Sequence, residues 1–519
     1  MKSDRLTLIV RDLTPQRILF LIILLGFWIR VFFVLSADFP LNDGGMFYTM
    51  VNDILSNGFR LPHYASYNHS GIPYAYPFLG FYLTAFISYA LHIPVISLIR
   101  FLPLLFSVLT IPLVYGIAKI LLRSSLFGLG AAIVFAILPR SYEWMIMGGG
   151  LTRSLGFVWA LASIVTCLVY ARHSAQKYVI YTGICLGLTF MSHLEMSLFA
   201  LYSVLLLTTY TTGLKRTLKI YCIAVFVGIT VSSIWWIPVI NTHGIQVFMR
   251  AFMTGFWSYS AILPLVFFNF TQEPFINLFA VLALLGVWVS LFRKEYLLPV
   301  WLSMIFVVNH RSASTMATLV VGLLSMNALR FLILPTLQSL DRSNRRRAMQ
   351  YAIGIVTIYI LSLFIGLILP KTSSLQSLNS TDISAMRWVR AHTKLSSSFL
   401  IVSALPYNAW AQDKVSEWFP AITERKSVMT IQGMEWLPDN LFNKRYELTR
   451  HMKECNNDSI DCLERTMKKN NLSFNYLYIT DTKLSETYSC CSLLLSSLKS
   501  SKRYSKIYSK EDISIWIKK

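Results

Sequence analysis

Acidic and histidine side chains gather in a long loop, residues 37–83, that follows the first apolar segment of the chain. This loop contains Asp38, Asp43, Asp53, His63 and His69. Helical bundles usually connect neighbouring helices in a few residues, whereas long polar loops on a rigid scaffold often carry binding and catalytic residues. We therefore expect the chemistry of this protein in the loop, with His63 as a candidate substrate contact.

Asp43 is the candidate general base. It lies in the sequence NDGGMFY, and the two glycines that follow it would let a ligand approach closely. A carboxylate whose neighbours fix its position can remove the proton of a hydroxyl group. The alternative role is structural, because Asp often caps a helix and the following MFYTMVNDILSNG reads as an amphipathic helix. The two roles are compatible with each other.

Glu143 is the second candidate catalytic carboxylate, in a polar turn at 139–153. Arg140 and Arg153 flank it, and three consecutive glycines, 148–150, separate it from Arg153. Glycines beside arginines suit a phosphate-bearing ligand, because the backbone can approach and each guanidinium can form paired hydrogen bonds. The alternative is a local ion pair between Arg140 and Glu143, which are three residues apart.

Four further residues are candidate ligands of the substrate. Arg30 lies inside the first apolar segment, where an arginine usually faces the bundle interior or extends to the membrane surface. His193 and Glu195 share a very short turn; they could transfer protons or bind a metal, or form a buried hydrogen-bonded pair. Arg311, beside His310 in another short turn, is a candidate anion ligand.

The sequence contains no P-loop and no G-x-G-x-x-G motif after a strand. Any sugar or phosphate donor is therefore expected to come from the membrane and not from a cytosolic nucleotide.

The elements that position these residues are membrane helices. The chain has 519 residues, 55% of them hydrophobic and 14% charged, and a mean hydropathy of +0.54. This composition is too apolar for a soluble protein, and the apolar runs have spanning length. The net charge of +22 lies in short clusters between these runs, as in loops at an anionic bilayer surface. Nucleic acid is therefore not an expected partner.

We predict about eleven spans, at roughly 17–36, 98–121, 125–139, 155–171, 178–192, 196–212, 220–240, 276–292, 296–309, 314–335 and 351–370. Lys and Arg clusters occupy every second connection, which predicts a cytoplasmic N-terminus. This alternation holds only if the apolar stretch 77–93 is excluded. Its 17 residues would extend only about 25 Å as a helix, so we expect a juxtamembrane or re-entrant helix there.

Residues 371–519 are predicted to form an external α+β domain behind a transmembrane domain of residues 1–370. FLIVSA, FNYLYIT and SKIYSKEDISIWI have strand patterns, and the polar segment 439–470 reads as helix. Cys455 and Cys462 could form a disulfide if this domain faces an oxidising compartment. Cys490 and Cys491 are adjacent, and the three remaining cysteines of the chain lie in apolar runs.

Several of these features resemble the GT-C glycosyltransferases, among them protein O-mannosyltransferases and lipid A aminoarabinose transferases. They are Asp43 in a long first external loop, the segment YAYPFLGFYL, and a polar external turn before the fourth span. MGGGLTRSLGF, SHLE, HRSASTMATL and SEWFPAITERKSVMTIQGMEWLP resemble a prokaryotic subgroup more narrowly. Members often carry a second acid directly after the first, whereas Gly44 follows Asp43 here; they also often carry an Asp where this chain has LTRS.

The resemblance implies a multi-pass enzyme of the plasma (inner) membrane that takes a sugar from a polyprenyl-phosphate donor. The acceptor would be a glycan, lipid or protein on the external side. Asp43 would act as general base in an inverting transfer, and arginines would hold the donor phosphate. A divalent cation, Mg or Mn, remains open as a cofactor. The alternatives are a transporter or flippase of a lipid-linked anion, which usually shows internal repeats, and an inactive protein of the same fold.

Overall fold

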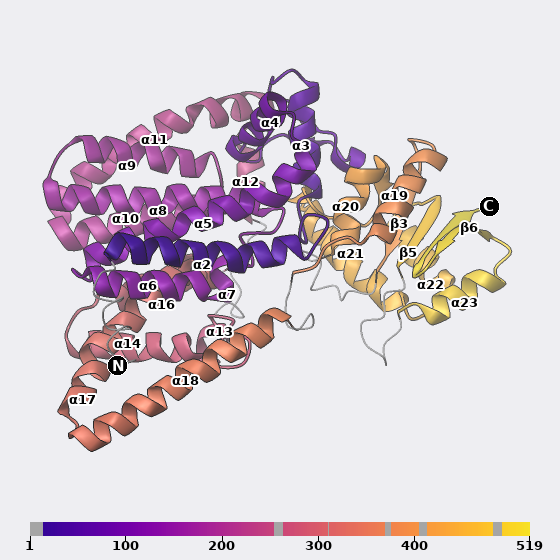
Figure 1. Ribbon diagram of the computed structural model, residues 1–519. Coiled ribbons are helices and arrows are strands. Elements are labelled where there is room, and N and C mark those ends of the chain that lie inside the picture. Colours follow the sequence, from indigo (N-terminus) through magenta and orange to yellow (C-terminus); the bar gives the residue numbers. More distant parts are fainter. Residues whose placement is uncertain (1–13, 254–262, 310, 369–374, 404–412, 481–489) are drawn as a thin grey trace.

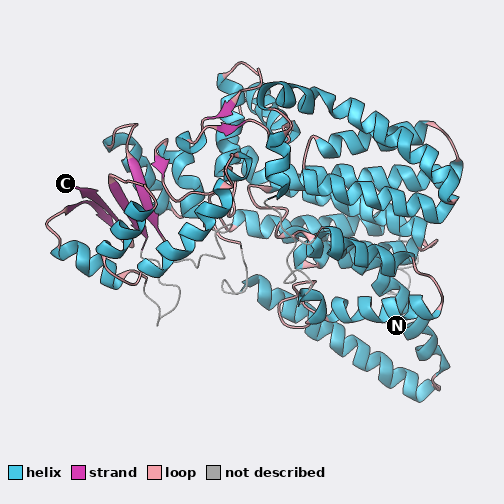
Figure 2. Cartoon of the chain, turned by 180° about the vertical axis from the view of Figure 1, so that it is seen from behind, coloured by secondary structure: helices cyan, strands magenta, loops and turns pink. Residues whose placement is uncertain are grey.

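The computed structural model describes residues 14–253, 263–309, 311–368, 375–403, 413–480 and 490–519. A bundle of helices forms one part of the molecule, and a smaller domain with a sheet lies against one end of it (Figure 1). Both termini of the described chain lie away from the junction of the two parts (Figures 1 and 2).

A helix covers each of the predicted spans. They are α2 (Pro15–Leu35), α5 (Val95–Leu121), α6 (Ser125–Ile137), α8 (Gly150–His173), α9 (Lys177–Phe190), α10 (Leu194–Thr212), α11 (Leu214–His243), α14 (Leu278–Phe292), α15 (Leu297–Val308), α16 (Ala313–Ala328) and α18 (Arg342–Ile368). Within the described ranges, seven helical segments are long and apolar enough to cross a membrane, whereas α6, α9, α14 and α15 are shorter. The chain is a multi-pass helical membrane protein, and the number of spans stays a prediction.

The turns of the bundle gather at its two ends as the charge pattern predicts. At one end, arginine side chains connect neighbouring turns by hydrogen bonds. Arg172 donates to the backbone carbonyl of Ile120, and Arg330 donates to the backbone carbonyl of Leu122. At the other end, the segments predicted to be external contact one another. The Gly148 N–H donates to the Leu41 carbonyl at 2.9 Å, for example. Which end faces the cytoplasm stays a prediction.

The long loop after α2 folds into a compact layer at this second end. It contains α3 (Gly45–Ser56), β1 (Tyr64–Ala65), β2 (Ile72–Pro73) and α4 (Leu79–Leu91). Helix α4 has 13 residues, about 20 Å at 1.5 Å per residue, which is short of the roughly 30 Å hydrocarbon core. It contacts α3, α5 and α8.

The C-terminal domain contains a mixed five-stranded sheet of order β4-β3-β5-β7-β6. Its strands are β3 (Ser398–Val402), β4 (Lys426–Ser427), β5 (Tyr476–Thr480), β6 (Tyr504–Lys510) and β7 (Ile513–Lys518). Strands β4, β3 and β5 are parallel, and β7 pairs antiparallel with β5 and β6. Its helices are α19 (Ser380–His392), α20 (Lys414–Thr423), α21 (Leu441–Cys455), α22 (Ile460–Lys469) and α23 (Ser492–Ser500). The strands and helices predicted from the sequence are thus present.

Side chains of the sheet alternate between two cores, as the pleat of a strand requires. On β3, Leu400 and Val402 pack in a core with residues of α21, α22 and α23. Phe399 and Ile401 belong to a second core that includes α3, α4 and α20. The second core therefore joins the C-terminal domain to the layer formed by residues 37–97.

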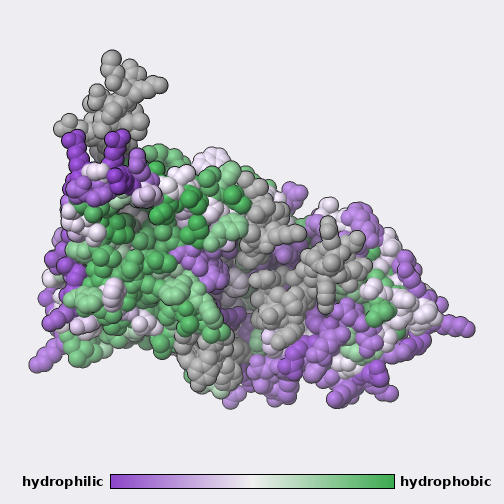
Figure 3. Space-filling model, turned by 90° about the horizontal axis from the view of Figure 1, so that it is seen from below, coloured by the Kyte–Doolittle hydropathy of each residue, from purple (hydrophilic) through white to green (hydrophobic). Residues whose placement is uncertain are grey.

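The structure joins Cys455 at the end of α21 to Cys462 in α22, with Cα atoms 5.6 Å apart. It also joins the adjacent Cys490 and Cys491. Space-filling colours show the difference between the two parts: hydrophobic residues cover much of the bundle, and hydrophilic residues cover most of the visible C-terminal domain (Figure 3).

Candidate active site

Asp43 is held at the N-terminus of α8. Its Oδ1 accepts a hydrogen bond from the Gly149 N–H at 2.7 Å, and its Oδ2 pairs with the Arg153 guanidinium at 2.9 Å. The two side chains are only 18% and 11% exposed. The α8 macrodipole adds to the attraction, because a helix N-terminus is partially positive. Asp43 does not cap its own helix, since Gly44 is the N-cap residue of α3 and no side chain caps it.

Glycines allow the Asp43 turn to touch the turn before α8. Gly44 has φ +119°, a left-handed conformation that favours glycine. A Cβ on Gly148 would lie 2.0 Å from the Asp43 carbonyl oxygen, and one on Gly149 would lie 2.3 Å from Asp43 Oδ2. The sequence suggested that glycines here would let a ligand approach. In the structure, they let two segments of the chain approach each other.

Two arginines face the same indole ring. The guanidinium carbon of Arg153 lies 4.5 Å from the Trp144 ring centroid, and that of Arg140 lies 5.5 Å from it. The Nε atoms of both arginines are buried and have no hydrogen-bond partner within the described chain. Unpaired buried donors are unfavourable, so both arginines can still bind an anion. Burial lowers the pKa of Arg140 to about 10, which leaves it charged at neutral pH.

Glu143 follows α7 (Pro139–Tyr142) as its C-cap residue, next in sequence to Trp144. Its charge raises the pKa of Arg140, opposing the larger effect of burial. Glu143 is therefore close enough to interact with Arg140.

His193 and Glu195 lie on the same face as Asp43, at the start of α10. The Glu195 Oε2 accepts from the Ser312 hydroxyl at 2.5 Å, which ties α10 to the turn before α16. His193 is buried, and its Nδ1 has no partner among the described residues. Burial lowers the pKa of His193 to about 4, against the attraction of Glu195. His193 is therefore neutral at physiological pH.

Arg311 is exposed beside this cluster and has no ion-pair partner in the ranges that the structure covers. Its charge acts on His193 and on Glu435. The neighbouring His310 lies outside the described residues.

Arg30 and His63 occupy other environments. Arg30 is fully buried; it donates to the Ser107 hydroxyl at 2.8 Å and to two backbone carbonyls. Its side chain therefore joins α2 to α5 and α6 and does not extend to the membrane surface. His63 is exposed, and its backbone carbonyl accepts from the Tyr74 N–H at 3.0 Å.

Sequence reasoning missed two carboxylates of the C-terminal domain, the buried Glu417 and the half-buried Glu435. Glu417 of α20 accepts a hydrogen bond from the Gly44 N–H at 2.8 Å, one residue from Asp43. Glu435 lies within electrostatic range of Arg311, and burial raises its pKa. Both residues lie in the segment SEWFPAITERKSVMTIQGMEWLP. The resemblance of this segment to the prokaryotic subgroup was the signal that could have identified them as candidates.

The described residues do not offer an evident metal site. They contain no group of three or more His, Cys, Asp or Glu side chains placed to hold an ion. Asp43 already binds N–H donors through both oxygens.

Solved membrane glycosyltransferases share this fold. The apo oligosaccharyltransferase of Archaeoglobus fulgidus matches with a TM-score of 0.58 and 13% identity, over 91% of this chain and 70% of that one. ArnT from Cupriavidus metallidurans, bound to undecaprenyl phosphate, matches with a TM-score of 0.54 and 15% identity, over 95% and 97% of the two chains. No protein family model and no curated protein matches. The chain thus has the fold of the GT-C glycosyltransferases.

Proposed function

We propose that this protein is an inverting glycosyltransferase. It moves a sugar from a polyprenyl-phosphate donor to an acceptor hydroxyl on the external side of the membrane. The observation that carries the proposal is the Asp43 carboxylate, fixed at the N-terminus of α8 beside arginines that retain unpaired N–H groups. The fold adds support, because solved relatives hold undecaprenyl phosphate in ArnT and dolichol-phosphate in the archaeal oligosaccharyltransferase AglB.

The donor phosphate would bind to the arginines around Trp144. Arg153 and Arg140 both have a free Nε, and guanidinium groups bind phosphate through paired hydrogen bonds. Arg311, exposed and without a described ion-pair partner, would add a third cation. These charges stabilise the negative charge that develops on the departing polyprenyl phosphate.

Asp43 would accept the proton of the acceptor hydroxyl as that oxygen attacks the anomeric carbon. The acceptor oxygen forms the new glycosidic bond while the bond to the donor phosphate breaks, so the configuration inverts without a covalent enzyme intermediate. In the free protein Oδ2 is paired with Arg153. A donor phosphate competes for Arg153, so donor binding would free this oxygen for the acceptor.

Asp43→Asn tests the assignment, because Asn keeps the size of Asp but cannot accept the proton. Transfer from a panel of radiolabelled polyprenyl-phosphate sugars should fall about 10²–10⁴-fold, the usual effect of losing a general base. Donor binding should change much less, since arginines hold the phosphate. Asp38→Asn, at an exposed position of the same loop, is the matched control and should keep full activity.

Two outcomes would contradict the proposal. Near wild-type transfer by Asp43→Asn would reject Asp43 as the base and leave Glu143 and Glu417 to be tested. Movement of the labelled lipid across vesicles without transfer of its sugar would favour the transporter alternative.

A further inference from the structure

Two consecutive residues of α20 hold the backbone on both sides of Asp43. The Trp418 indole N–H donates to the Asn42 carbonyl at 3.0 Å, and the Gly44 N–H donates to Glu417 Oε1 at 2.8 Å. The contact is close: a Cβ on Gly45 would lie 2.6 Å from the Glu417 carbonyl oxygen. The C-terminal domain therefore holds the turn that carries the proposed base through two hydrogen bonds, one on each side of Asp43.

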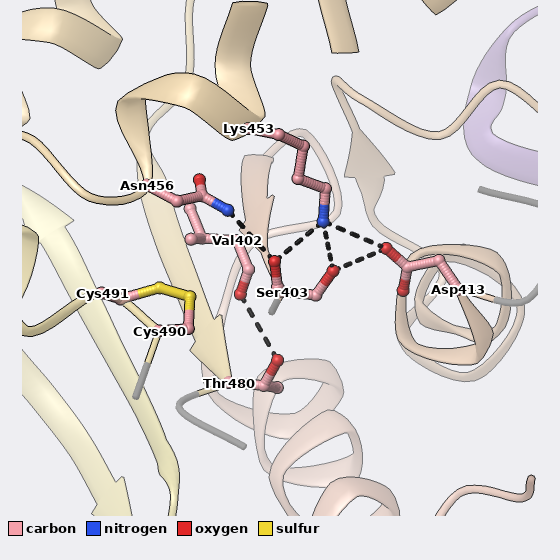
Figure 4. Close-up of a disulfide and its surroundings, with 8 residues drawn as sticks. All are labelled: Val402, Ser403, Asp413, Lys453, Asn456, Thr480, Cys490 and Cys491. Carbon is pink, nitrogen blue, oxygen red and sulfur yellow. Dashed lines mark hydrogen bonds and ion pairs between the residues drawn. A yellow bond between two sulfur atoms is a disulfide. The ribbon is translucent and has the colours of Figure 1, made fainter. Parts of the chain in front are cut away.

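The start of α20 is itself fixed to the rest of its domain. Asp413 caps the helix, with Oδ1 accepting from the Ser416 N–H at 3.0 Å. Its Oδ2 accepts from the Ser403 hydroxyl at 2.6 Å, and Lys453 of α21 donates to the same hydroxyl at 2.7 Å (Figure 4). Glu417 follows one turn later, so its position is set by the whole sheet domain.

Glu417 is buried and faces charged groups from several elements. Asp43 and Arg153 both act on its carboxyl group, and the Tyr67 hydroxyl donates to its backbone carbonyl at 2.7 Å. Gln432 lies 3.5 Å from Oε2, and Glu435 acts on Tyr67. Burial and the Asp43 charge raise the pKa of Glu417 to about 8, while the Gly44 N–H and Arg153 oppose the shift. Glu417 is therefore largely protonated at neutral pH.

We propose that Glu417 is a positioning residue for Asp43: by accepting the Gly44 N–H it holds the turn that carries Asp43, so that sugar transfer requires the docked C-terminal domain. This inference rests on the proposed function of Asp43. It makes α20 a structural link between the domain and the reaction centre. When Glu417 loses its proton, its negative charge repels the Asp43 carboxylate, and this repulsion opposes the hydrogen bond that holds the turn.

The test compares Glu417→Ala with Glu417→Gln in the full-length protein. Alanine leaves the buried Gly44 N–H without an acceptor, so kcat should fall on the order of ten- to a hundred-fold with little change in donor KM. Glutamine keeps the acceptor oxygen and cannot ionise. It should restore most of the lost rate at pH 7 and remove the fall in activity that we expect of the wild type as the pH rises through the Glu417 pKa. Glu424→Gln, at the exposed end of the same helix, is the control and should keep both rate and pH profile.

A wild-type pH profile in Glu417→Gln, or full activity in Glu417→Ala, would overturn the proposal. An infrared titration separates this failure from failure of the proposed function, because it needs no turnover. A protonated carboxyl band present in wild type at pH 7 should be absent from Glu417→Gln and should titrate at lower pH in Asp43→Asn. If these bands appear but no donor is turned over, the interaction between Glu417 and Asp43 is supported and only the transferase assignment fails. If the bands are missing, the interaction between the two carboxyl groups is rejected.

Discussion

At the scale of single residues, the ion pair between Asp43 and Arg153 bears on the order of events in the proposed mechanism. The pair occupies Oδ2 at 2.9 Å, and the Gly149 N–H occupies Oδ1. A general base needs a free lone pair directed at the proton that it accepts. A phosphate at Arg153 removes the competing partner of Oδ2. The geometry therefore favours donor binding before the acceptor is deprotonated.

Arg153→Lys should weaken donor binding more than it changes the chemical step. Lysine keeps the positive charge but lacks the fork that binds phosphate through two hydrogen bonds. A lost charged hydrogen bond is worth about 1.5–3 kcal/mol, so the donor KM should rise about tenfold or more. Steady-state kinetics over a range of donor concentrations measures this effect. Arg390→Lys, at an exposed ion pair of α19, serves as the control. An unchanged donor KM in Arg153→Lys would show that Arg153 does not bind the donor.

The residue types around Asp43 predicted part of this site, and the structure explains why the rest was not predicted. Asp43, Arg140 and Arg153 could be selected because carboxylates, arginines and glycines share two predicted external turns. Glu417 could not, since its hydrogen bond to Gly44 spans 373 residues and depends on how the sheet domain docks. Arg30 was selected for its rarity inside a membrane span, but its environment is four hydrogen bonds to neutral oxygens.

At the scale of elements, the N-terminus of α8 is the platform of the site. It supplies the Gly149 N–H and, one turn later, the Arg153 guanidinium. Glycines at 148 and 149 let the Asp43 turn lie directly against it. The spacing of MGGGLTR thus places a backbone donor and a cation on one carboxylate.

Gly149→Ala should displace Asp43 from this platform. The new Cβ would lie 2.3 Å from Asp43 Oδ2 and 2.9 Å from the Arg153 guanidinium, and overpacking of this kind typically costs about 1–3 kcal/mol. Transferase activity should fall at least tenfold while the purified protein stays folded, as judged by gel filtration and circular dichroism. Gly354→Ala is the control, because a Cβ there meets nothing within 4 Å. Equal activity of the two variants would show that close contact at Gly149 is not required.

Hydrophobic pattern predicted the elements better than it predicted their arrangement. Each predicted span has a helix. Helix α4 has 13 residues, the same length as the predicted span α6, so its exclusion from the spans stays a prediction from the charge alternation. The alternating strands FLIVSA and FNYLYIT became β3 and β5. The order β4-β3-β5-β7-β6 was not predictable, because it depends on pairings between strands far apart in the sequence. Nor was the shared core of β3, α3 and α20, which forms only after the two parts meet.

At the scale of the whole molecule, the C-terminal domain covers the end of the bundle that carries Asp43. An isolated β bridge joins Leu41 to Ser377, and the backbones of Asn42 and Gln376 bond at 2.6 Å. The chain therefore leaves the bundle beside the proposed base and returns to it through α20. This arrangement places Asp43 at the junction of the bundle and the C-terminal domain. Figure 3 shows that the bundle surface is largely hydrophobic and that the visible surface of the domain is largely hydrophilic. A lipid donor and a water-soluble acceptor would both reach such a junction.

The orientation of this junction in the membrane gives the last prediction. Basic turns lie at the end of the bundle opposite to Asp43, and Lys and Arg are enriched in cytoplasmic loops. A single cysteine at Ser500, exposed in the C-terminal domain, should therefore react with a membrane-impermeant maleimide in intact cells. A cysteine at Ser343, exposed in the basic first turn of α18, should react only after permeabilisation. Both variants need Cys222 replaced by Ser, because that thiol is free and exposed. Labelling of Ser343→Cys alone in intact cells would reverse the orientation and move the whole site to the cytoplasmic face, where a lipid-linked donor would have to present its sugar inside the cell.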